Sequence, residues 1–178
     1  MQPKPIQRPR KRLYTEAERA RRDATKWTLV QGILAPLQFL AFGVSLVLVV
    51  RFMMTGEGYT AATVSILIKT AFLYIIMVTG AIWEKVVFGQ YLFAPAFFWE
   101  DVFSFAVIAL HTLYLYGLVT GTLDPAAQMA VVLAAYATYV INAGQFLWKL
   151  RMARRDAELD LNGTSPAAPT PDVKGVAA

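Results

Sequence analysis

The stretch "TLVQGILAPLQFLAFGVSLVLVV", Thr28 to Val50, contains no charged residue. At ~1.5 Å of rise per residue, a helix of this length crosses the ~30 Å hydrocarbon layer of a bilayer. The run is too long for the core of a signal peptide and has no small-residue cleavage site after it. We therefore expect it to remain in the protein as the first of several membrane-spanning helices.

Three further apolar segments of similar length follow, at Ala61–Trp83, about Val102–Val119 and Ala126–Trp148. The polar links "TGEGYT" (Thr55–Thr60) and "TGTLDP" (Thr120–Pro125) are typical of tight turns between helices. With 57% hydrophobic and 16% charged residues, the composition lies outside the range of soluble globular proteins. The sequence predicts an all-α polytopic membrane protein, a bundle of four transmembrane helices.

Basic residues predict the orientation of this bundle. Nine Lys and Arg precede the first span and four lie within Lys149–Arg155, whereas the links after spans one and three carry almost none. Because positive charge stays on the cytoplasmic side, both termini should be cytoplasmic. One tryptophan lies at the cytoplasmic end of each span, as in an interfacial aromatic belt: Trp27, Trp83, Trp99 and Trp148.

The domain plan follows from these signals. Residues 1–26 form a basic cytoplasmic segment, in which Thr15 and Glu18 match a capping box and predict a short helix. Residues 27–155 form the transmembrane domain, and the composition of residues 156–178 predicts a disordered tail.

Several function classes are excluded by composition. The chain has no cysteine and one histidine, which removes thiolate chemistry, cysteine-ligated metals and a protein zinc site. No nucleic-acid-binding motif accompanies the basic residues, so a lipid bilayer is the expected partner of that charge.

Polar residues inside the spans are expected to join helices. Gln31, Gln38 and Ser45 recur every seven residues on one face of the first span. Lys69 lies ~12 Å inside the outer end of the second span, and we expect its long stem to extend outward to the interface.

On the fourth span, small side chains share one face and predict close helix packing: Ala126, Ala130, Ala134 and Thr138.

Counting 100° per residue, one stripe of the third span contains Glu100, Ser104, His111 and Tyr114, provided that the helix begins by Glu100. His111 lies roughly 16 Å deeper than Glu100. Two interpretations of His111 stay open. It is a neutral imidazole bonded to a neighbouring helix, or it is a ligand to a metal that a substrate or cofactor carries.

The segment "WEKVVFGQYLFAPAFFWED", Trp83 to Asp101, holds seven aromatic residues and three acids. An interfacial loop with anchoring rings accounts for its tryptophans. A wall of rings also suits a flat apolar ligand, and acids at its edge would be desolvated. Desolvation and a neighbouring acid both favour the protonated carboxyl, which can then donate its proton.

Three strings carry a family resemblance: "MVTGAIWEKVVFGQYLFAPAFFWEDVFS" (Met77–Ser104), "ALHT" (Ala109–Thr112) and "LYTEAERARRDATKW" (Leu13–Trp27). With them the chain resembles the 2-vinyl bacteriochlorophyllide hydratase family from about Leu13 to about Arg155. The resemblance implies a cofactor-independent lyase of the cytoplasmic or intracytoplasmic photosynthetic membrane in a phototrophic bacterium. Its reaction would add water across the 3-vinyl group of chlorophyllide a, or of the corresponding bacteriochlorophyllide, on the route to bacteriochlorophyll a. The magnesium would belong to the substrate.

Water adds to a vinyl group only after a proton does, so this reaction needs an acid and a base. We expect Glu100 or Asp101 to be the acid and the other to be the base, with Glu84 as the reserve candidate. Alternatively, Glu84 forms an interfacial ion pair with Lys85.

The remaining substrate contacts are assigned by chemistry. Lys85 would meet the pigment's propionate, Ser104 would lie in the binding stripe, and His111 would ligate the magnesium. Five rings would pack on the macrocycle: Trp83, Tyr91, Phe97, Phe98 and Trp99.

Two other classes of function also remain compatible with the sequence. In a non-catalytic tetrapyrrole carrier or assembly protein the same rings would bind pigment and the acids would only mark the interface. A four-helix transport subunit is a third possibility. Contacts with neighbouring pathway enzymes and a homo-oligomer are also compatible with the sequence.

Overall fold

The computed structural model describes residues 13–161, and within that range the chain forms five helices. They are α1 (Glu16–Ala24), α2 (Lys26–Thr55), α3 (Tyr59–Phe88), α4 (Phe98–Thr120) and α5 (Pro125–Leu161). The last four are each long and apolar enough to cross a membrane. The predicted all-helical architecture with four candidate spans is confirmed.

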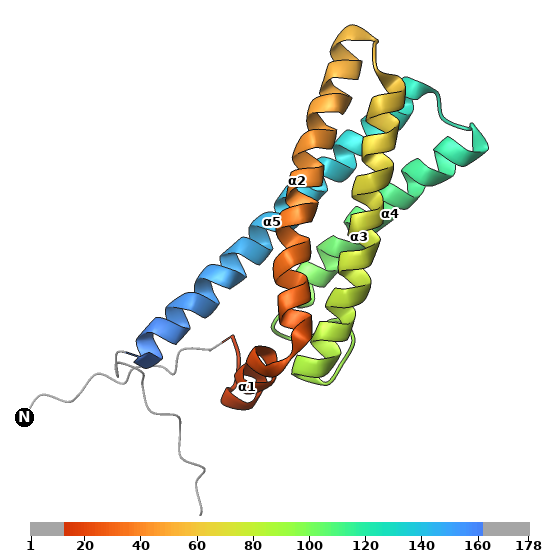
Figure 1. Cartoon of the computed structure of the whole chain (residues 1–178). Helices are drawn as coiled ribbons and strands as arrows, with labels where there is room; N and C mark the ends of the chain where they lie inside the picture. The colour runs from red at the N-terminus through yellow and green to blue at the C-terminus, as the bar shows by residue number, and fades with distance from the viewer. Residues whose placement is uncertain (1–12, 162–178) are drawn as a thin grey trace, which may run out of the picture.

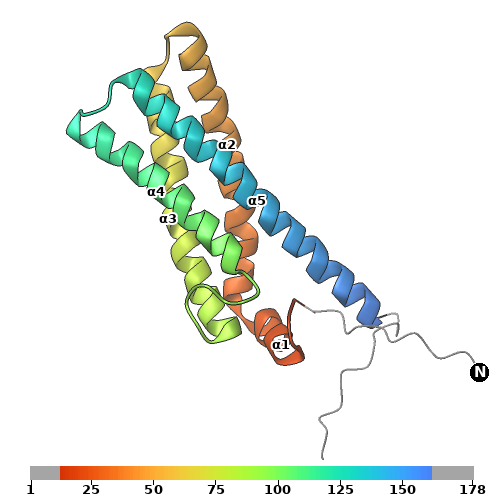
Figure 2. The ribbon, with the colours of Figure 1, turned by 180° about the vertical axis from the view of Figure 1, so that it is seen from behind.

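The four long helices form two antiparallel hairpins. α2 lies along α3 and α4 lies along α5, and the second hairpin crosses behind the first (Figure 1). Figure 2 shows the crossing from behind, with the end of α5 leaning away from the other helices. The α3–α4 connection and α1 lie at the same end of the bundle, and the two shorter links lie at the opposite end.

The helices extend beyond the apolar segments that predict them. α4 begins at Phe98 and so includes Glu100. The predicted polar stripe of the third span required the helix to begin by that residue. α5 continues to Leu161, so residues 156–161 are helical and the tail does not begin at 156 as expected. "RMARRDAELDL" (Arg151–Leu161) contains three Arg, two Ala and two Leu, which are strong helix formers. The other residues of the expected tail, and residues 1–12, lie outside the described range.

The capping box at the start of α1 is confirmed. The backbone N–H of Glu18 donates to Thr15 Oγ1 at 3.3 Å, and the N–H of Thr15 donates to the Glu18 carboxylate at 2.8 Å. Arg21 Nε donates to the Val87 carbonyl at 2.8 Å, which fixes α1 against the end of α3. Tyr14 stacks on Phe88, and its burial raises the pKa of the phenol to about 12.

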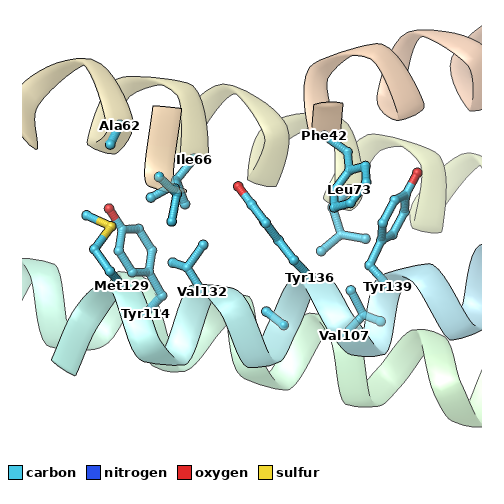
Figure 3. Packing of buried hydrophobic residues seen from close by; sticks show 12 residues of the cluster. Phe42, Ala62, Ile66, Leu73, Val107, Tyr114, Met129, Val132, Tyr136 and Tyr139 are labelled. Atoms are coloured by element: carbon cyan, nitrogen blue, oxygen red, sulfur yellow. The ribbon is translucent and has the colours of Figure 1, made fainter. Parts of the chain in front are cut away.

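The larger core lies where the hairpins cross (Figure 3). Tyr136 and Tyr139 extend from α5 to Phe42 on α2, with ring centroids 5.3 Å and 4.9 Å from it. The Tyr136 hydroxyl also hydrogen-bonds Ser45 Oγ at 2.6 Å. Because aromatic pairs contribute about 0.5–1.5 kcal/mol beyond their buried area, these contacts hold the two hairpins together.

The expected polar contacts of the first span are present for two of its residues. Gln31 Nε2 donates to Thr79 on α3 at 2.8 Å, and Ser45 joins α3 through Ser65 Oγ at 2.8 Å as well as α5. Gln38 is buried, but its Oε1 has no hydrogen-bond partner within residues 13–161.

The small-residue strip of α5 does not pack as expected. Ala126, Ala130 and Ala134 are exposed, and α5 buries larger residues such as Met129 and Val132 instead. The buried face of α5 combines these larger residues with a single alanine of the core, Ala135.

Candidate active site

Three acidic side chains come together where α3 ends and α4 begins. Gly89 ends α3 with a φ of 87°, which glycine adopts without steric cost, and the chain turns back there. Glu84 lies in the last turns of α3, and Glu100 and Asp101 lie in the first turn of α4. Their exposed fractions are only 5%, 4% and 4%, so none of the three acids points into open water.

Glu84 and Asp101 lie close together, because two consecutive backbone N–H groups bind one carboxyl group each. The N–H of Ala94 donates to Glu84 Oε2 at 3.3 Å, and the N–H of Phe93 donates to Asp101 Oδ2 at 2.6 Å. Two buried carboxyl groups this close favour a proton on one of them, because two like charges out of water repel each other. The shorter N–H bond stabilises the ionised form of Asp101 more than that of Glu84.

The connection between α3 and α4 is held over this pair. Phe93 has a φ of 59°, the one positive value at a non-glycine residue within 13–161. Such a conformation is strained for a residue with a Cβ and needs support from its surroundings. The bond from the Phe93 N–H to Asp101 supplies that support, which couples the acid to the conformation of the connection.

Glu100 points toward α5 rather than toward the pair. Its Oε1 lies 3.5 Å from Nζ of Lys149, and Lys149 also donates to the Ala96 carbonyl. The same ammonium group lies 5.4 Å from the centre of the Phe97 ring. In the sequence, Lys149 stands out only as one of the basic residues that flank the fourth span. Its pairing with Glu100 could not be predicted, because it depends on the register of α5 against α4.

The predicted aromatic wall is divided into two groups. Phe97 is buried and Trp83 is half-buried; they pack edge to face on each other and around Phe88, beside Tyr14. Trp83 Nε1 also donates to Thr28 Oγ1 at 2.9 Å. These two rings belong to a second, smaller core that lies next to the acids.

The other rings form an exposed aromatic face. Tyr91, Phe98 and Trp99 are 60%, 45% and 65% exposed. Phe93 joins them and stacks on Phe105, with centroids 5.5 Å apart and planes 11° apart. Phe105 was not predicted as a site residue, although its spacing of four residues from Asp101 places it one turn away on α4.

Lys85 is exposed and does not pair with Glu84. Its Nζ donates to the Gly89 carbonyl at 2.7 Å and lies 5.3 Å from the centre of the Tyr91 ring. The alternative of an interfacial ion pair is therefore wrong, because Glu84 turns inward to Asp101 while Lys85 caps the end of α3.

Ser104 lies one turn deeper than Glu100 and is buried against α5. Its Oγ accepts a hydrogen bond from Asn142 Nδ2 at 2.9 Å. Asn142 was not among the predicted site residues.

Lys69 is completely buried, so the expectation that it extends to the interface is wrong. Its Nζ bonds His111 Nε2 at 2.8 Å and lies 4.3 Å from the centre of the Tyr139 ring. The other ring nitrogen of His111 bonds the Val107 carbonyl at 2.8 Å. Burial against aromatic rings and an imidazole acceptor satisfies Lys69 without a path to water.

His111 therefore matches the first of its two interpretations. Its exposed fraction is 1% and both ring nitrogens are engaged, which leaves no free nitrogen for a ligand's metal in this conformation. The polar stripe itself is confirmed, since Glu100, Ser104, His111 and Tyr114 are all on the buried face of α4.

Open hollows on the outside of α2 lie apart from the acids. One is lined by residues from Phe39 to Leu48 and the other by residues from Leu46 to Thr55, toward the end of α2 opposite α1. Their lining is almost entirely apolar, as expected for a surface that a bilayer covers. Within residues 13–161 no cluster of three His, Asp or Glu side chains is arranged to hold a metal ion.

The family model described as 2-vinyl bacteriochlorophyllide hydratase matches residues 14–152. The chain belongs to the 2-vinyl bacteriochlorophyllide hydratase family. It is therefore a hydratase, an enzyme that adds water to a double bond.

Two curated relatives carry the same description. The Rhodobacter capsulatus protein is 79% identical over 155 residues, which are 87% of this chain and 90% of the relative. The Cereibacter sphaeroides protein is 75% identical over 158 residues, which are 89% of this chain and 98% of the relative. No solved structure matches the chain.

Proposed function

We propose that this hydratase converts the 3-vinyl group of chlorophyllide a, or of 3-vinyl bacteriochlorophyllide a, to a 1-hydroxyethyl group in bacteriochlorophyll a biosynthesis. The names of the relatives support the vinyl group as the reacting part. The observation that carries the mechanism is the burial of Glu84 beside Asp101, next to the exposed aromatic face.

The reaction begins with proton transfer. Glu84 gives its proton to the terminal vinyl carbon, so that its O–H bond breaks and a C–H bond forms. The cation is then on the carbon next to the ring, where the macrocycle delocalises it and ionised Asp101 stabilises it. This assignment moves Glu84 from reserve candidate to acid, because Asp101 accepts the shorter backbone bond.

Water completes the addition. Its oxygen bonds the cationic carbon, and Glu100 accepts the proton that water loses. The ammonium group of Lys149 lies 3.5 Å from Glu100 Oε1 and orients this carboxyl group. The proton on Glu100 returns through solvent to Glu84, and the enzyme is restored without a cofactor.

The pigment lies against the exposed rings, with its plane on Phe93, Phe98 and Phe105. Because Asp101 is buried beneath Phe93, the pigment enters when the connection between α3 and α4 moves aside. The strained φ of Phe93 lowers the cost of that movement. Lys85 is near enough to this face, through Tyr91, to receive the propionate.

The same proposal places the protein in the cytoplasmic or intracytoplasmic membrane with both termini on the cytoplasmic side. The basic flanks support this orientation. The magnesium remains part of the pigment and takes its axial ligand from water rather than from His111, since magnesium prefers oxygen ligands.

The test is a single incubation of the purified protein, in detergent or lipid, with chlorophyllide a under anaerobic conditions and without added cofactor. Chromatography should show the vinyl pigment replaced by its 1-hydroxyethyl derivative. Recovery of unchanged pigment bound to the protein would contradict hydration of this substrate and favour a carrier.

A further inference from the structure

Three acceptor oxygens are enclosed between α4 and α5 without a hydrogen-bond donor from residues 13–161. They are Oε2 of Glu100, Oδ1 of Asn142 and Oε1 of Gln145. Glu100 and Asn142 are 4% and 7% exposed. Buried acceptors without donors are costly, and buried polar groups in proteins are normally satisfied by protein or by water. Three of them at one helix interface indicate a bound group.

Two side-chain contacts fix the register of the interface and place these oxygens in one column along it. Asn142 bonds Ser104, and one to two turns further along the antiparallel pair Lys149 meets Glu100. Gln145 follows Asn142 by three residues and precedes Lys149 by four, so it shares their face of α5. Gln145 is therefore level with the turn between Glu100 and Ser104.

The chemistry of the column identifies what binds there. All three free groups are acceptors, so the occupant must donate. The carbonyl and carboxylate oxygens of a chlorophyllide only accept, and its vinyl group has no polar atom. Water donates two hydrogen bonds, is small enough for a helix interface and is the second substrate of the proposed reaction.

We infer that the attacking water binds in this α4–α5 column, where Gln145 and Asn142 orient it and Glu100 receives its proton. The inference rests on the proposed hydration and adds two positioning residues to it. Consecutive residues on a helix point ~100° apart, so Asp101 faces α3 and Glu100 faces α5. In this proposal the proton comes from the α3 side of α4 and the water from the α5 side.

The test uses Gln145→Met, which removes the acceptor and keeps the length of the side chain. Gln38→Met is the matched control, because it removes another buried, unpartnered amide oxygen on α2, away from the acids. Each protein is incubated with chlorophyllide a in D₂O, and both the hydroxyethyl product and the deuterium in recovered vinyl pigment are measured. Deuterium at the terminal carbon reports proton transfer that was not followed by water capture.

We expect Gln145→Met to lower hydration at least about tenfold, the usual effect of losing one buried hydrogen bond to a reacting group. Deuterium incorporation and pigment binding should stay near wild type, and Gln38→Met should hydrate normally. Asn142→Leu should give the same separation of the two steps.

Other results would overturn the proposed water-binding site between α4 and α5. Unchanged hydration in both Gln145→Met and Asn142→Leu would remove it and leave the Glu84–Asp101 mechanism intact. Parallel loss of hydration and deuterium incorporation would assign the two residues to pigment binding or packing instead. If the wild-type protein neither hydrates the pigment nor incorporates deuterium, the proposed function fails together with the inference.

Discussion

At the residue scale, the acids of this site differ through their partners and not through their burial, which is nearly equal. Glu84 lies beside a second carboxyl group, whereas Glu100 meets an ammonium group. In the proposed mechanism this difference in partners separates the acid, Glu84, from the base, Glu100.

Replacing Glu84 by Gln removes the transferable proton but keeps the size and the Ala94 contact. We expect turnover of the vinyl pigment to fall by about 10²–10⁴-fold, the usual contribution of a general acid, with pigment binding unchanged. Glu57→Gln, at an exposed glutamate in the α2–α3 link, should behave as wild type. Product chromatography and pigment absorption measure the two effects; a Glu84→Gln variant of normal rate would disprove the acid assignment.

Lys149 and Glu100 form a second test at this scale. Lys149→Met leaves a buried carboxylate without its cation and should cost about 1–3 kcal/mol in the free energy of unfolding. Glu100→Gln in the same chain should recover most of that stability but no activity, because the base is then missing. Thermal unfolding in detergent and hydration assays compare the single and double variants; additive losses of stability would mean that the two groups do not interact.

At the scale of helices, α4 joins α3 and α5 through the polar side chains of its buried face. Its buried face runs from the acids through Ser104 and His111 to Tyr114. One helix therefore contacts α3 through Asp101 and His111, and α5 through Glu100 and Ser104. Such polar contacts between membrane helices average about 0.6 kcal/mol each, so their number matters more than any single one.

The Lys69–His111 bond has a structural role, because it joins α3 to α4 in the middle of the bundle. His111→Leu leaves the Lys69 ammonium without its acceptor and should destabilise the bundle by about 1–3 kcal/mol. The absorption spectrum of bound pigment should not change, and Lys69→Met with His111→Leu should restore stability. A shifted spectrum with His111→Leu alone would restore the magnesium-ligand interpretation.

At the scale of the whole molecule, the apolar exterior and the basic ends determine how the bundle meets a bilayer. The four tryptophans lie at the end of the bundle that also carries α1 and the acids. Under the proposed function, a site at this level would receive a flat pigment from the bilayer and protons from water. The orientation of that end toward the cytoplasm is a prediction from charge.

The absence of cysteine makes this orientation measurable. Single substitutions Glu57→Cys, in the α2–α3 link, and Arg154→Cys, on the exposed side of α5, each introduce one thiol. In cells whose outer membrane has been permeabilised, a membrane-impermeant maleimide should label the Glu57→Cys variant. The Arg154→Cys variant should stay unlabelled until the inner membrane is opened as well. The reverse pattern would invert the topology and place the acids on the periplasmic side.

The sequence by itself determined the helices, their approximate ends, the capping box at Thr15 and the polar stripe of α4. These depend on quantities that are local in the chain: transfer of successive side chains from water, backbone hydrogen bonding and the 100° step of a helix. The acids and rings of Trp83–Asp101 were found in the same way, because they are close in sequence.

Only the tertiary structure decided which groups meet. The pairing of Glu84 with Asp101, of Glu100 with Lys149 and of Lys69 with His111 depends on how far each helix is rotated and shifted against its neighbours. Rotation and shift are set by the packing of all side chains at once, so no single stretch of sequence contains them. For the same reason Phe97 became core while Phe105 reached the surface.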